Sequence, residues 1–270
     1  MPIAGAVQFG GRSGIDLKAS PSLDITSSTA GFSVQFWIKR TGAGVDDVVL
    51  TQQPGFEVGY KADDTFTLSF GSVVSLDTAV TYAADAGVWV HWTSSYSAYS
   101  TAMKIYRYGK KTDEAAASAP PPTSVGDWFI GRNAESPPFY MAAALDELRV
   151  FNRELSAFDI DSSQIGGVYE MNLYATGDPN WQLQLTVAHG LVLSMTFDSP
   201  TSLHRDDSGA ENHGVVSPLL YAVKSKSESD RSQRGQRGAV SFGSTTSHYG
   251  RKNSMNNAPT LAFTFSVWTK

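Results

Sequence analysis

The stretch FSVQFWIK at residues 32–39 alternates with a period of two. Its even-numbered residues are all apolar, whereas its odd-numbered residues are polar apart from Trp37. Successive side chains of an extended chain point to opposite faces, so the even-numbered residues share one face. The pattern predicts a β-strand that buries this face in a core and turns the other face outward.

Short runs rich in β-branched and aromatic residues follow this stretch, with glycine, proline and aspartate between them. They cover residues 48–51, 56–60, 65–70, 88–93, 103–108, 128–130 and 145–151. Helical periodicity is almost absent, apart from one short turn that Ser156 would cap, with Asp159 three residues further on. Many short strands at this spacing predict an all-β fold, an antiparallel two-sheet jelly-roll sandwich.

Two segments near the start of the chain recur near its end. AVQFG at residues 6–10 recurs as AVSFG at residues 239–243, an offset of 239 − 6 = 233, and FSVQFWIK is echoed at residues 263–270. A repeat of this length corresponds to whole domains. We expect a segment of a longer tandem array, with one nearly complete unit at 1–165, a connector at 166–190 and half of a second unit at 191–270.

The composition excludes several classes of protein. A net charge of −5 and a pI near 5.5 give no general attraction to nucleic acid or to an anionic membrane surface. The chain has no cysteine, which rules out disulfides, thiolate metal sites and a cysteine nucleophile. Its apolar runs are shorter than the roughly 20 residues of a membrane helix. We therefore expect no nucleic-acid partner and no membrane insertion.

Five segments in order resemble motifs of laminin G-like, concanavalin A-like lectin domains. They are FSVQFWIK at residues 32–39, GVWVHW at 87–92, KIYRYGK at 104–110, FIGR at 129–132 and LDELRVFNRELS at 145–156. The resemblance implies a jelly-roll sandwich over residues 6–160. It also implies a protein that works outside the cell or at the cell surface.

The second unit contains what the first unit lacks. LVLSMTFD at residues 191–198 and DDSGAENHG at 206–214 resemble the family's first strand and the polar loop near it. Only five residues precede Ala6, so the first unit lacks this strand and would leave an unpaired sheet edge. We therefore predict that residues 191–198 pair with the first sandwich instead of starting an incomplete second one.

The sequence argues against an enzyme. Laminarinase-type hydrolases of related fold need two carboxylates on one strand face, in a Glu-x-Asp-x-x-Glu arrangement. The nearest pair here is Asp146 and Glu147, and adjacent strand residues point to opposite faces. His91 and the serines near it lack the Gly-x-Ser-x-Gly turn of a serine nucleophile.

The resemblance also implies a calcium site, because some laminin G-like and pentraxin-like domains bind calcium at the sandwich rim. The matching loops offer Gln52 on one side and Asn133 and Glu135 on the other. Oxygen ligands suit calcium, although a single carboxylate among amides implies weak binding.

Asp146 is a further candidate calcium ligand. The alternation predicts that it shares a strand face with Leu148 and Val150, so if that face is buried, its carboxylate must be hydrogen-bonded or bound to metal. The alternative is that Asp146 accepts backbone N–H groups and locks the closing loop.

Aromatic residues supply a second candidate site. Trp37 lies on the polar face of its strand, where an exposed ring could stack on a sugar. Tyr96 and Tyr99, with serines between them, could line an adaptable rim beside it. The alternative is that both faces of the strand are covered and that Trp37 belongs to the core.

These observations predict a non-catalytic binding module of a secreted or cell-surface protein. Its partner would be a carbohydrate or an extracellular protein, as in lectins and cell-adhesion modules, with neighbouring domains in the same longer chain. Two alternatives stay open. One is a structural spacer without a ligand, and the other is an accessory domain of a glycoside hydrolase or sialidase.

Overall fold

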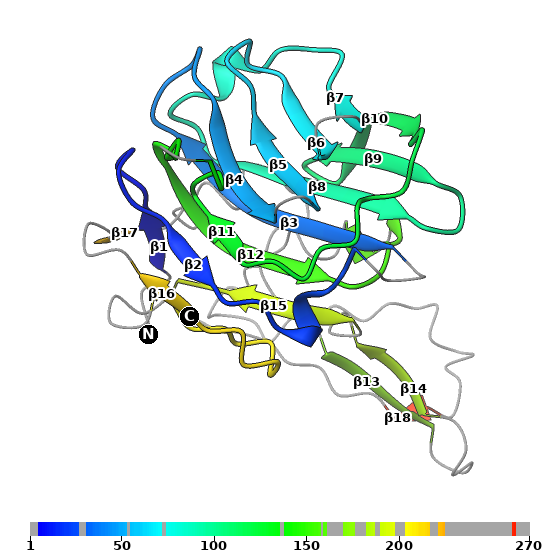
Figure 1. Ribbon diagram of the computed structural model, residues 1–270. Coiled ribbons are helices and arrows are strands. Elements are labelled where there is room, and N and C mark those ends of the chain that lie inside the picture. Colours follow the sequence, from blue (N-terminus) through cyan, green and yellow to red (C-terminus); the bar gives the residue numbers. More distant parts are fainter. Residues whose placement is uncertain are drawn as a thin grey trace, which may run out of the picture.

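The protein is described by a computed structural model (Figure 1). The structure describes residues 5–26, 31–52, 55–71, 74–135, 138–157, 159–160, 170–175, 182–186, 190–197, 203–216, 221–224 and 261–262. These residues form strands and two short 3₁₀ turns, η1 (Pro21–Leu23) and η2 (Ala83–Asp85), and residues 157, 159 and 160 are helical. Ser156 Oγ accepts the N–H of Asp159 at 3.2 Å, as the predicted cap requires. Within the described part of the chain, the structure holds no helix of the length and hydropathy that a membrane span requires.

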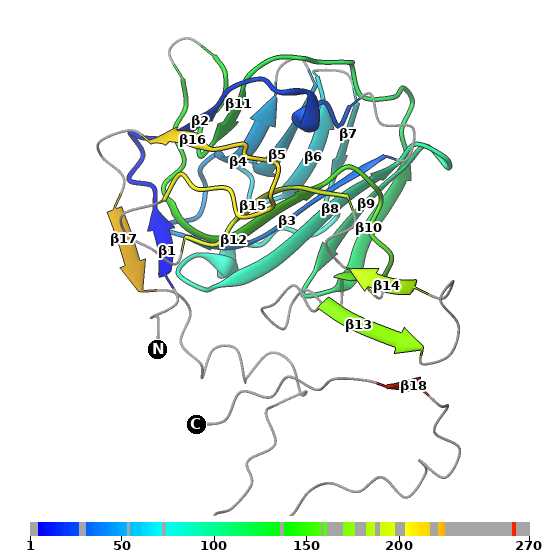
Figure 2. The ribbon, with the colours of Figure 1, turned by 90° about the horizontal axis from the view of Figure 1, so that it is seen from below.

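Two antiparallel sheets stack as a sandwich, which confirms the predicted fold class (Figure 2). The first, sheet A, has the order β10-β9-β8-β3-β12-β1-β17, and β15 also pairs with β12. Its strands are β10 (Lys110–Ala116), β9 (Ala102–Arg107), β8 (Val90–Ser97), β3 (Phe32–Arg40), β12 (Ala143–Phe151), β1 (Gly5–Gln8), β17 (Tyr221–Lys224) and β15 (Leu191–Met195).

The second, sheet B, has the order β16-β2-β11-β4-β5-β6-β7. Its strands are β16 (Gly214–Val216), β2 (Ile15–Leu17), β11 (Trp128–Ile130), β4 (Asp47–Gln52), β5 (Phe56–Tyr60), β6 (Phe66–Phe70) and β7 (Val74–Asp77). Strands from distant parts of the sequence are neighbours in both sheets, as expected for a jelly roll.

The apolar faces of the two sheets pack together to form the core. All four even-numbered apolar residues of the 32–39 stretch lie in it, as the alternation predicted. Aromatic rings fill its centre. Phe66 stacks on Trp92 with ring centroids 4.1 Å apart, and Trp92 Nε1 donates to the Tyr60 hydroxyl at 2.7 Å. The indole is therefore both buried and hydrogen-bonded, as a core tryptophan requires.

Strand β12 has neighbours along both edges. β3 pairs with one edge, while β1 and β15 share the other edge end to end, β15 through residues 148–151. β15 belongs to the segment that we expected to pair with the first sandwich, and residues 191–195 make this ladder. Residues 214–216 similarly pair with β2 in sheet B. Residues 190–216 thus contribute a strand to each sheet.

A small antiparallel sheet lies outside the sandwich, on the side of sheet A (Figure 2). It contains β13 (Glu170–Ala175), β14 (Gln182–Thr186) and β18 (Leu261–Ala262). The repeated segments at residues 239–243 and 263–270 lie outside the described residues, so the division into a connector and a second unit stays a prediction.

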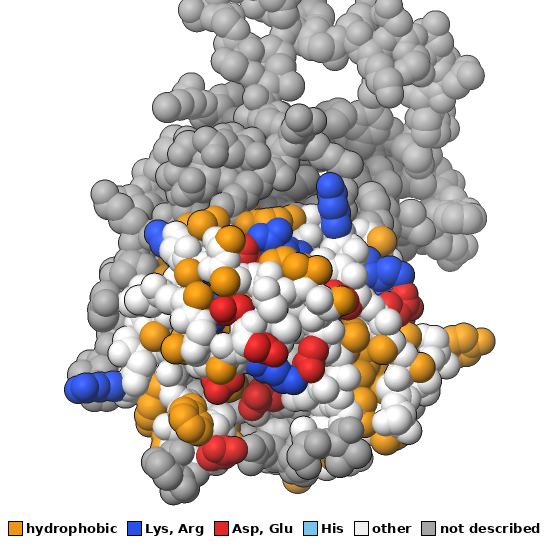
Figure 3. Space-filling view, turned by 90° about the horizontal axis from the view of Figure 1, so that it is seen from above, with side chains coloured by type: hydrophobic (Ala, Val, Ile, Leu, Met, Phe, Trp, Pro, Cys, Tyr) orange, Lys and Arg blue, Asp and Glu red, His pale blue; other side chains and the backbone are white. Residues whose placement is uncertain are grey.

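Charged side chains gather at the end of the sandwich where the β3–β4 and β5–β6 turns lie. Figure 3 views this end and shows acidic side chains around basic ones. The buried member of the group is Arg40, whose Nε and Nη1 atoms contact Asp47 at 3.0 Å and Asp64 at 2.8 Å. This ion-pair network fastens β3 to β4 and to the β5–β6 turn.

Candidate binding site

The three aromatic residues proposed for a ligand site lie in three different environments. Trp37 is on the outer face of sheet A but is only 4% exposed, beside His91 and Tyr108 with ring centroids 5.2 and 6.1 Å away. Tyr96 points into the core and meets Phe70 edge-on at 5.1 Å. Tyr99 is 98% exposed in the β8–β9 turn. The structure does not bring these residues together.

The proposed calcium ligands are also separated. Gln52 is buried at the end of β4, opposite Trp128 and Phe56, and its Nε2 donates to the carbonyls of Ser124 and Gly126 at 3.1 and 3.2 Å. These bonds occupy Nε2, whereas the buried Oε1 atom of Gln52 accepts no hydrogen bond from the described residues. Asp146 lies in sheet A, on the other layer of the sandwich. Gln52 and Asp146 therefore cannot share one ion in this arrangement.

Asn133 and Glu135 follow β11 at the rim of sheet B. Asn133 Oδ1 accepts the N–H of Phe139 at 2.8 Å, which closes the loop on itself, while Glu135 is exposed. The Glu135 carboxylate repels the negative charge of Glu57 on β5. Burial raises the pKa of Glu57, and the nearby negative charges of Glu135 and Asp46 raise it further. Among the described residues, no three histidine or acidic side chains are grouped in a way that could hold a metal ion.

The predicted orientation of Asp146 is wrong because β12 contains a β-bulge. Glu147 has a φ of 56°, and the pairing with β3 shifts between Asp146 and Arg149. The extra residue breaks the period-two alternation. Asp146 pairs with Trp37 and therefore lies on the outer face of sheet A, away from Leu148 and Val150 in the core.

Asp146 and Glu147 also do not point to opposite faces. Arg149 lies opposite Gln35, an outer-face residue of β3, and Glu147 forms an ion pair with Arg149 on that face. The two carboxylates therefore sit on the same side of sheet A. Both are buried or nearly so, which leaves them in contact with protein groups instead of an open cleft.

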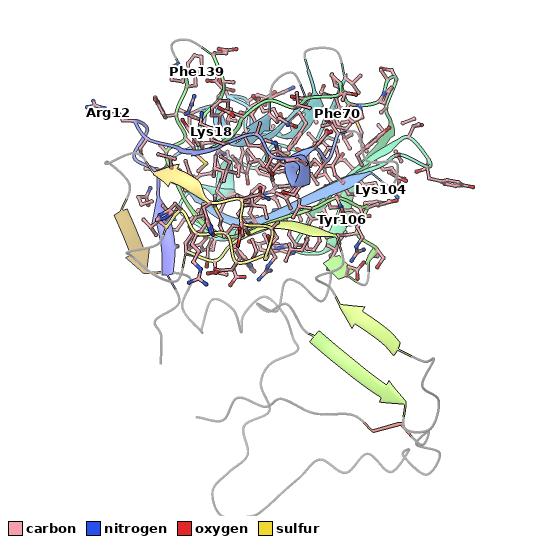
Figure 4. The ribbon with its side chains drawn as sticks, turned by 60° about the horizontal axis from the view of Figure 1, so that its bottom comes forward. Arg12, Lys18, Phe70, Lys104, Tyr106 and Phe139 are labelled. Carbon is pink, nitrogen blue, oxygen red and sulfur yellow. The ribbon has the colours of Figure 1, made fainter. Side chains whose placement is uncertain are left out.

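The central row of side chains on the outer face of sheet A is mostly polar yet buried. It crosses from Arg149 through Gln35 to Thr93 and then to Tyr106, and all four are at most 7% exposed. Tyr106 and Lys104, both from β9, are labelled in Figure 4. Near this edge Leu155 and Ile160 pack with Tyr106 in a small apolar cluster. The central row therefore does not offer an open site.

An open site occurs in the loop between β15 and β16, which is drawn in yellow in Figure 2. It is a pocket of about 450 Å³. The residues that line it are His204, Arg205, Asp206, Asp207, Gly209, Glu211 and His213. All of them except Asp206 are exposed. Phe197 and Leu203, on the sandwich side of this loop, are buried in the core cluster and anchor it.

Asp206 holds this loop in shape. Its carboxylate is 4% exposed and accepts four hydrogen bonds, from the N–H groups of Ser194, Ser208 and Asn212, each at 2.9 Å, and from the Ser208 hydroxyl at 2.8 Å. A carboxylate has about four acceptor positions, so this one is saturated. The Asp206 N–H in turn donates to Nδ1 of His213 at 3.1 Å, which orients that ring.

Asn212 connects the loop to the sandwich. Its Nδ2 donates to the Val192 carbonyl at 2.7 Å, and its Oδ1 accepts from the Ser20 hydroxyl at 2.6 Å, beside η1. Around the pocket, Arg205 pairs with Asp207 at 2.8 Å and both remain partly exposed. The pocket thus presents a cation, two carboxylates and two imidazoles on a backbone that is fixed by the hydrogen bonds of Asp206 and Asn212.

The sequence analysis did not identify the pocket residues as a site, although it noted the 206–214 loop. The available signal was the density of charged and imidazole side chains in residues 204–213. Local sequence could not show that the loop packs beside β2 and η1, nearly 200 residues earlier in the chain.

A family comparison now adds to this geometry. The family model described as the concanavalin A-like lectin/glucanases superfamily matches residues 9–161. The chain belongs to this superfamily. No curated protein matches the chain.

Two solved structures show the same superfamily fold. One is a candidate carbohydrate-binding protein from Bacteroides ovatus, with a TM-score of 0.61 and 14% identity, covering 83% of this chain. The chain spans 60% of that protein's length. The other is a heptameric SAP-like pentraxin from Limulus polyphemus, with a TM-score of 0.51 and 13% identity, covering 83% of this chain and 97% of the pentraxin. At these identities the likeness concerns the fold.

Proposed function

We propose that this chain is a non-catalytic module that binds a glycan in the pocket of residues 204–213. The observation that carries the proposal is the saturated Asp206 carboxylate. Because Asp206 fixes the backbone of its own loop, the backbone that carries Arg205, Asp207 and Glu211 is held in place before a ligand arrives. Such preorganisation lowers the entropy cost of binding.

The chemistry of the pocket suits a ligand with many hydroxyl groups. Carboxylates accept hydrogen bonds from hydroxyls, and a guanidinium donates to hydroxyl and ring oxygens. Arg205 and Asp207 already form an ion pair, so neither charge needs a charged ligand to balance it. A neutral sugar can bond to both without separating them.

The buried carboxylate is committed to structure, which favours binding over catalysis. Asp206 accepts four hydrogen bonds from its own segment, so it has no acceptor position left for a substrate. The names of the structural relatives also support the proposal, since the Bacteroides ovatus protein is described as carbohydrate-binding. A position outside the cell, with further domains in the same protein, fits this function.

Calcium belongs to the proposal as a secondary ligand at the rim of sheet B. Glu57 and Glu135 supply two carboxylates there, and Asn133 lies in the same loop as Glu135. The separation of this rim from Asp206 predicts that glycan binding in the 204–213 pocket does not require calcium.

Glycan-array binding of the 270-residue chain, with and without EDTA, tests the function. We expect a glycan signal that EDTA leaves unchanged and that Arg205→Ala and Glu211→Ala each weaken by about 10-fold or more, since a hydrogen bond to a charged group contributes roughly 1.5–3 kcal/mol. Lys110→Ala, at the exposed first position of β10, is the matched control and should bind normally.

The other outcomes separate the alternatives. Silence across a wide array would overturn the glycan proposal and favour a spacer or a protein ligand. A signal lost in EDTA would move the site to the rim of sheet B. A signal that survives both pocket substitutions would place the ligand elsewhere on the sandwich.

A further inference from the structure

Residues 190–216, here called the donor segment, bind the sandwich as a separate piece. β15 pairs with β12 in sheet A through residues 191–195, and β16 pairs with β2 in sheet B through residues 214–216. Neither strand has a second partner among the described residues. The donor segment is therefore added to an edge of each sheet and closes one side of the sandwich.

The donor segment holds its own shape through internal hydrogen bonds. Asp206 accepts from Ser194, Ser208 and Asn212, all within the segment. The N–H of Asp207 donates to the Ser194 carbonyl at 2.7 Å, and the N–H of Gly214 donates to the His204 carbonyl at 2.8 Å. The segment can thus bind and leave as one unit, without rebuilding its loop each time.

The surface that receives the donor segment is specific. Leu193, Met195, Phe197 and Leu203 are at most 6% exposed and join the core. Gly214 lies against Ile15, where an added Cβ would be 2.2 Å from the Ile15 side chain. The receiving surface therefore combines an apolar slot, a strand edge in each sheet and a contact that fits glycine.

The chain between the sandwich and the donor segment is long. From Ile160 to Gly190 there are 189 − 160 = 29 intervening residues. The β13–β14 hairpin lies between residues 170 and 186 of this stretch, which leaves 29 − 17 = 12 residues outside it. At about 3.3 Å per extended residue these 12 residues span up to roughly 40 Å, and opening the hairpin would lengthen the reach towards a neighbouring molecule. The hydrogen bonds of the β12–β15 and β2–β16 ladders would be the same whichever molecule supplied the donor segment.

We propose that the donor segment is a strand-exchange element, through which one copy of this chain completes the sandwich of a second copy. The occupant of the β12 and β2 edges is then residues 190–216 of another molecule. Exchange of an identical element between copies needs no new contact, so it is an accessible route to a dimer. The 204–213 pocket would travel with the donor segment, although the exchange does not depend on what that pocket binds.

Disulfide trapping can test the exchange, because the chain has no cysteine of its own. Arg149 lies opposite Ser194 in the β12–β15 ladder. Directly opposed positions of this kind are close enough for a disulfide. The Arg149→Cys and Ser194→Cys variants are purified separately, mixed under reducing conditions, oxidised and run on a non-reducing gel. We expect a mixed band at twice the monomer mass of 29.1 kDa.

The control pair is Ser33→Cys mixed with Ser95→Cys, which are opposed in the β3–β8 ladder inside the sandwich. These strands are not expected to exchange, so this mixture should stay monomeric. Leu148→Cys with Met195→Cys, also opposed in the β12–β15 ladder, replaces the first pair if Arg149→Cys fails to fold.

Three results would overturn the proposal. The first is a gel on which the mixed single variants give monomer alone, although a chain that carries both Arg149→Cys and Ser194→Cys cross-links internally. That result would mean that the donor segment does not leave its own sandwich. The second is no cross-link in either format, which would contradict the ladder itself. The third is an equal dimer yield from the Ser33 and Ser95 pair, which would indicate unspecific opening.

Discussion

Two buried aspartates, Asp47 and Asp206, are held in different ways. Asp47 is 1% exposed and accepts from Arg40 at 3.0 Å and from the N–H of Ala142 at 3.0 Å. Asp206 is 4% exposed and accepts from three N–H groups and a hydroxyl of its own segment. The first carboxylate depends on a buried cation and on an N–H group beside another strand, whereas the second depends on uncharged groups of its own segment.

The difference indicates which part of the molecule is fixed and which part can be separated. Arg40 ties together strands and turns of the sandwich, so its loss would leave buried charges without a partner. Asp206 organises a loop that is joined to the sandwich by strand edges, by Asn212 and by the buried side chains of Phe197 and Leu203. We therefore expect substitutions at Arg40 to act on global stability, and substitutions at Asp206 to act mostly on the loop and its ligand.

The largest effect is expected for Arg40→Met. The change leaves Asp47 without its buried cation and Asp64 without the contact at 2.8 Å. Breaking a buried ion pair by removing one partner costs about 3–5 kcal/mol of unfolding free energy. Urea unfolding followed by tryptophan fluorescence measures it.

Lys18→Met is the matched control for Arg40→Met, since Lys18 pairs with Asp127 at 2.7 Å on the exposed surface. This substitution should change the unfolding free energy far less. Similar losses for the two variants would contradict the role given to the buried network.

Asp206→Asn should have the next largest effect. The amide keeps the shape of the carboxylate but places an NH₂ group against the donors that Asp206 now accepts. We expect a loss of about 1–3 kcal/mol, together with loss of glycan binding. Thermal unfolding and array binding measure the two consequences separately.

The exposed neighbour Asp207 supplies the control for Asp206→Asn. Asp207→Asn should leave stability almost unchanged while weakening glycan binding, because Asp207 faces the pocket. Unchanged binding in Asp206→Asn would show that the loop needs no fixed shape, and the contrast between the two aspartates would fail.

The sequence predicted the sandwich well because period-two alternation survives in most strands. β5 and β11 have the expected bounds, residues 56–60 and 128–130. β10 was not predicted, since KKTDEAA at residues 110–116 is a mostly exposed edge strand without an apolar face. Edge strands with charged side chains are a known defence against aggregation, and they leave little hydrophobic pattern to detect.

The candidate site was much harder to predict, and particular residues show why. The bulge at Glu147, which has a positive φ, places Asp146 on the opposite face from Leu148 and Val150. The alternation of polar and apolar residues does not predict a bulge at a residue other than glycine. Gln52 is held by carbonyls more than 70 residues away, so its local sequence could not exclude a rim position. Trp37 was correctly placed on the outer face, but only the fold shows that its ring is buried there.

Acid pH offers a finer test of the Arg40 network. The N–H of Gly44 at 2.9 Å and the guanidinium of Arg40 hold the pKa of Asp64 below its ordinary value of 3.8. The unfolded chain then binds more protons than the folded one in acid. The stabilisation from Asp64 is complete above the unfolded pKa and is lost as the pH falls through the lower folded pKa.

We therefore expect Asp64→Asn to lose less stability than the wild type as the pH falls from about 5 to about 3. Urea unfolding at each pH measures the difference, and Lys110→Ala, which changes no carboxylate, should follow the wild type. An Asp64→Asn curve parallel to the wild-type curve would show that Asp64 has the same pKa folded and unfolded.

Calcium should produce the smallest effect. Glu57 and Glu135 supply two carboxylates at the rim of sheet B, but Gln52 is buried at 1% exposure and Asp146 lies in the other sheet. A site with so few ligands corresponds to a Kd on the order of 1 mM. At about 1 mM calcium this contributes about 0.4 kcal/mol, or a Tm rise of roughly 1 °C.

The sign of the pH effect sharpens this last test. Calcium binds the ionised carboxylates, and the pKa of Glu57 is raised by burial and by Glu135, so the Tm rise should be larger at neutral pH than in mild acid. Glu57→Gln should abolish the rise, whereas Glu114→Gln on the exposed β10 edge should keep it. A rise of several degrees that Glu57→Gln leaves intact would place calcium outside this rim, and would make the donor segment and its carboxylates the next region to examine.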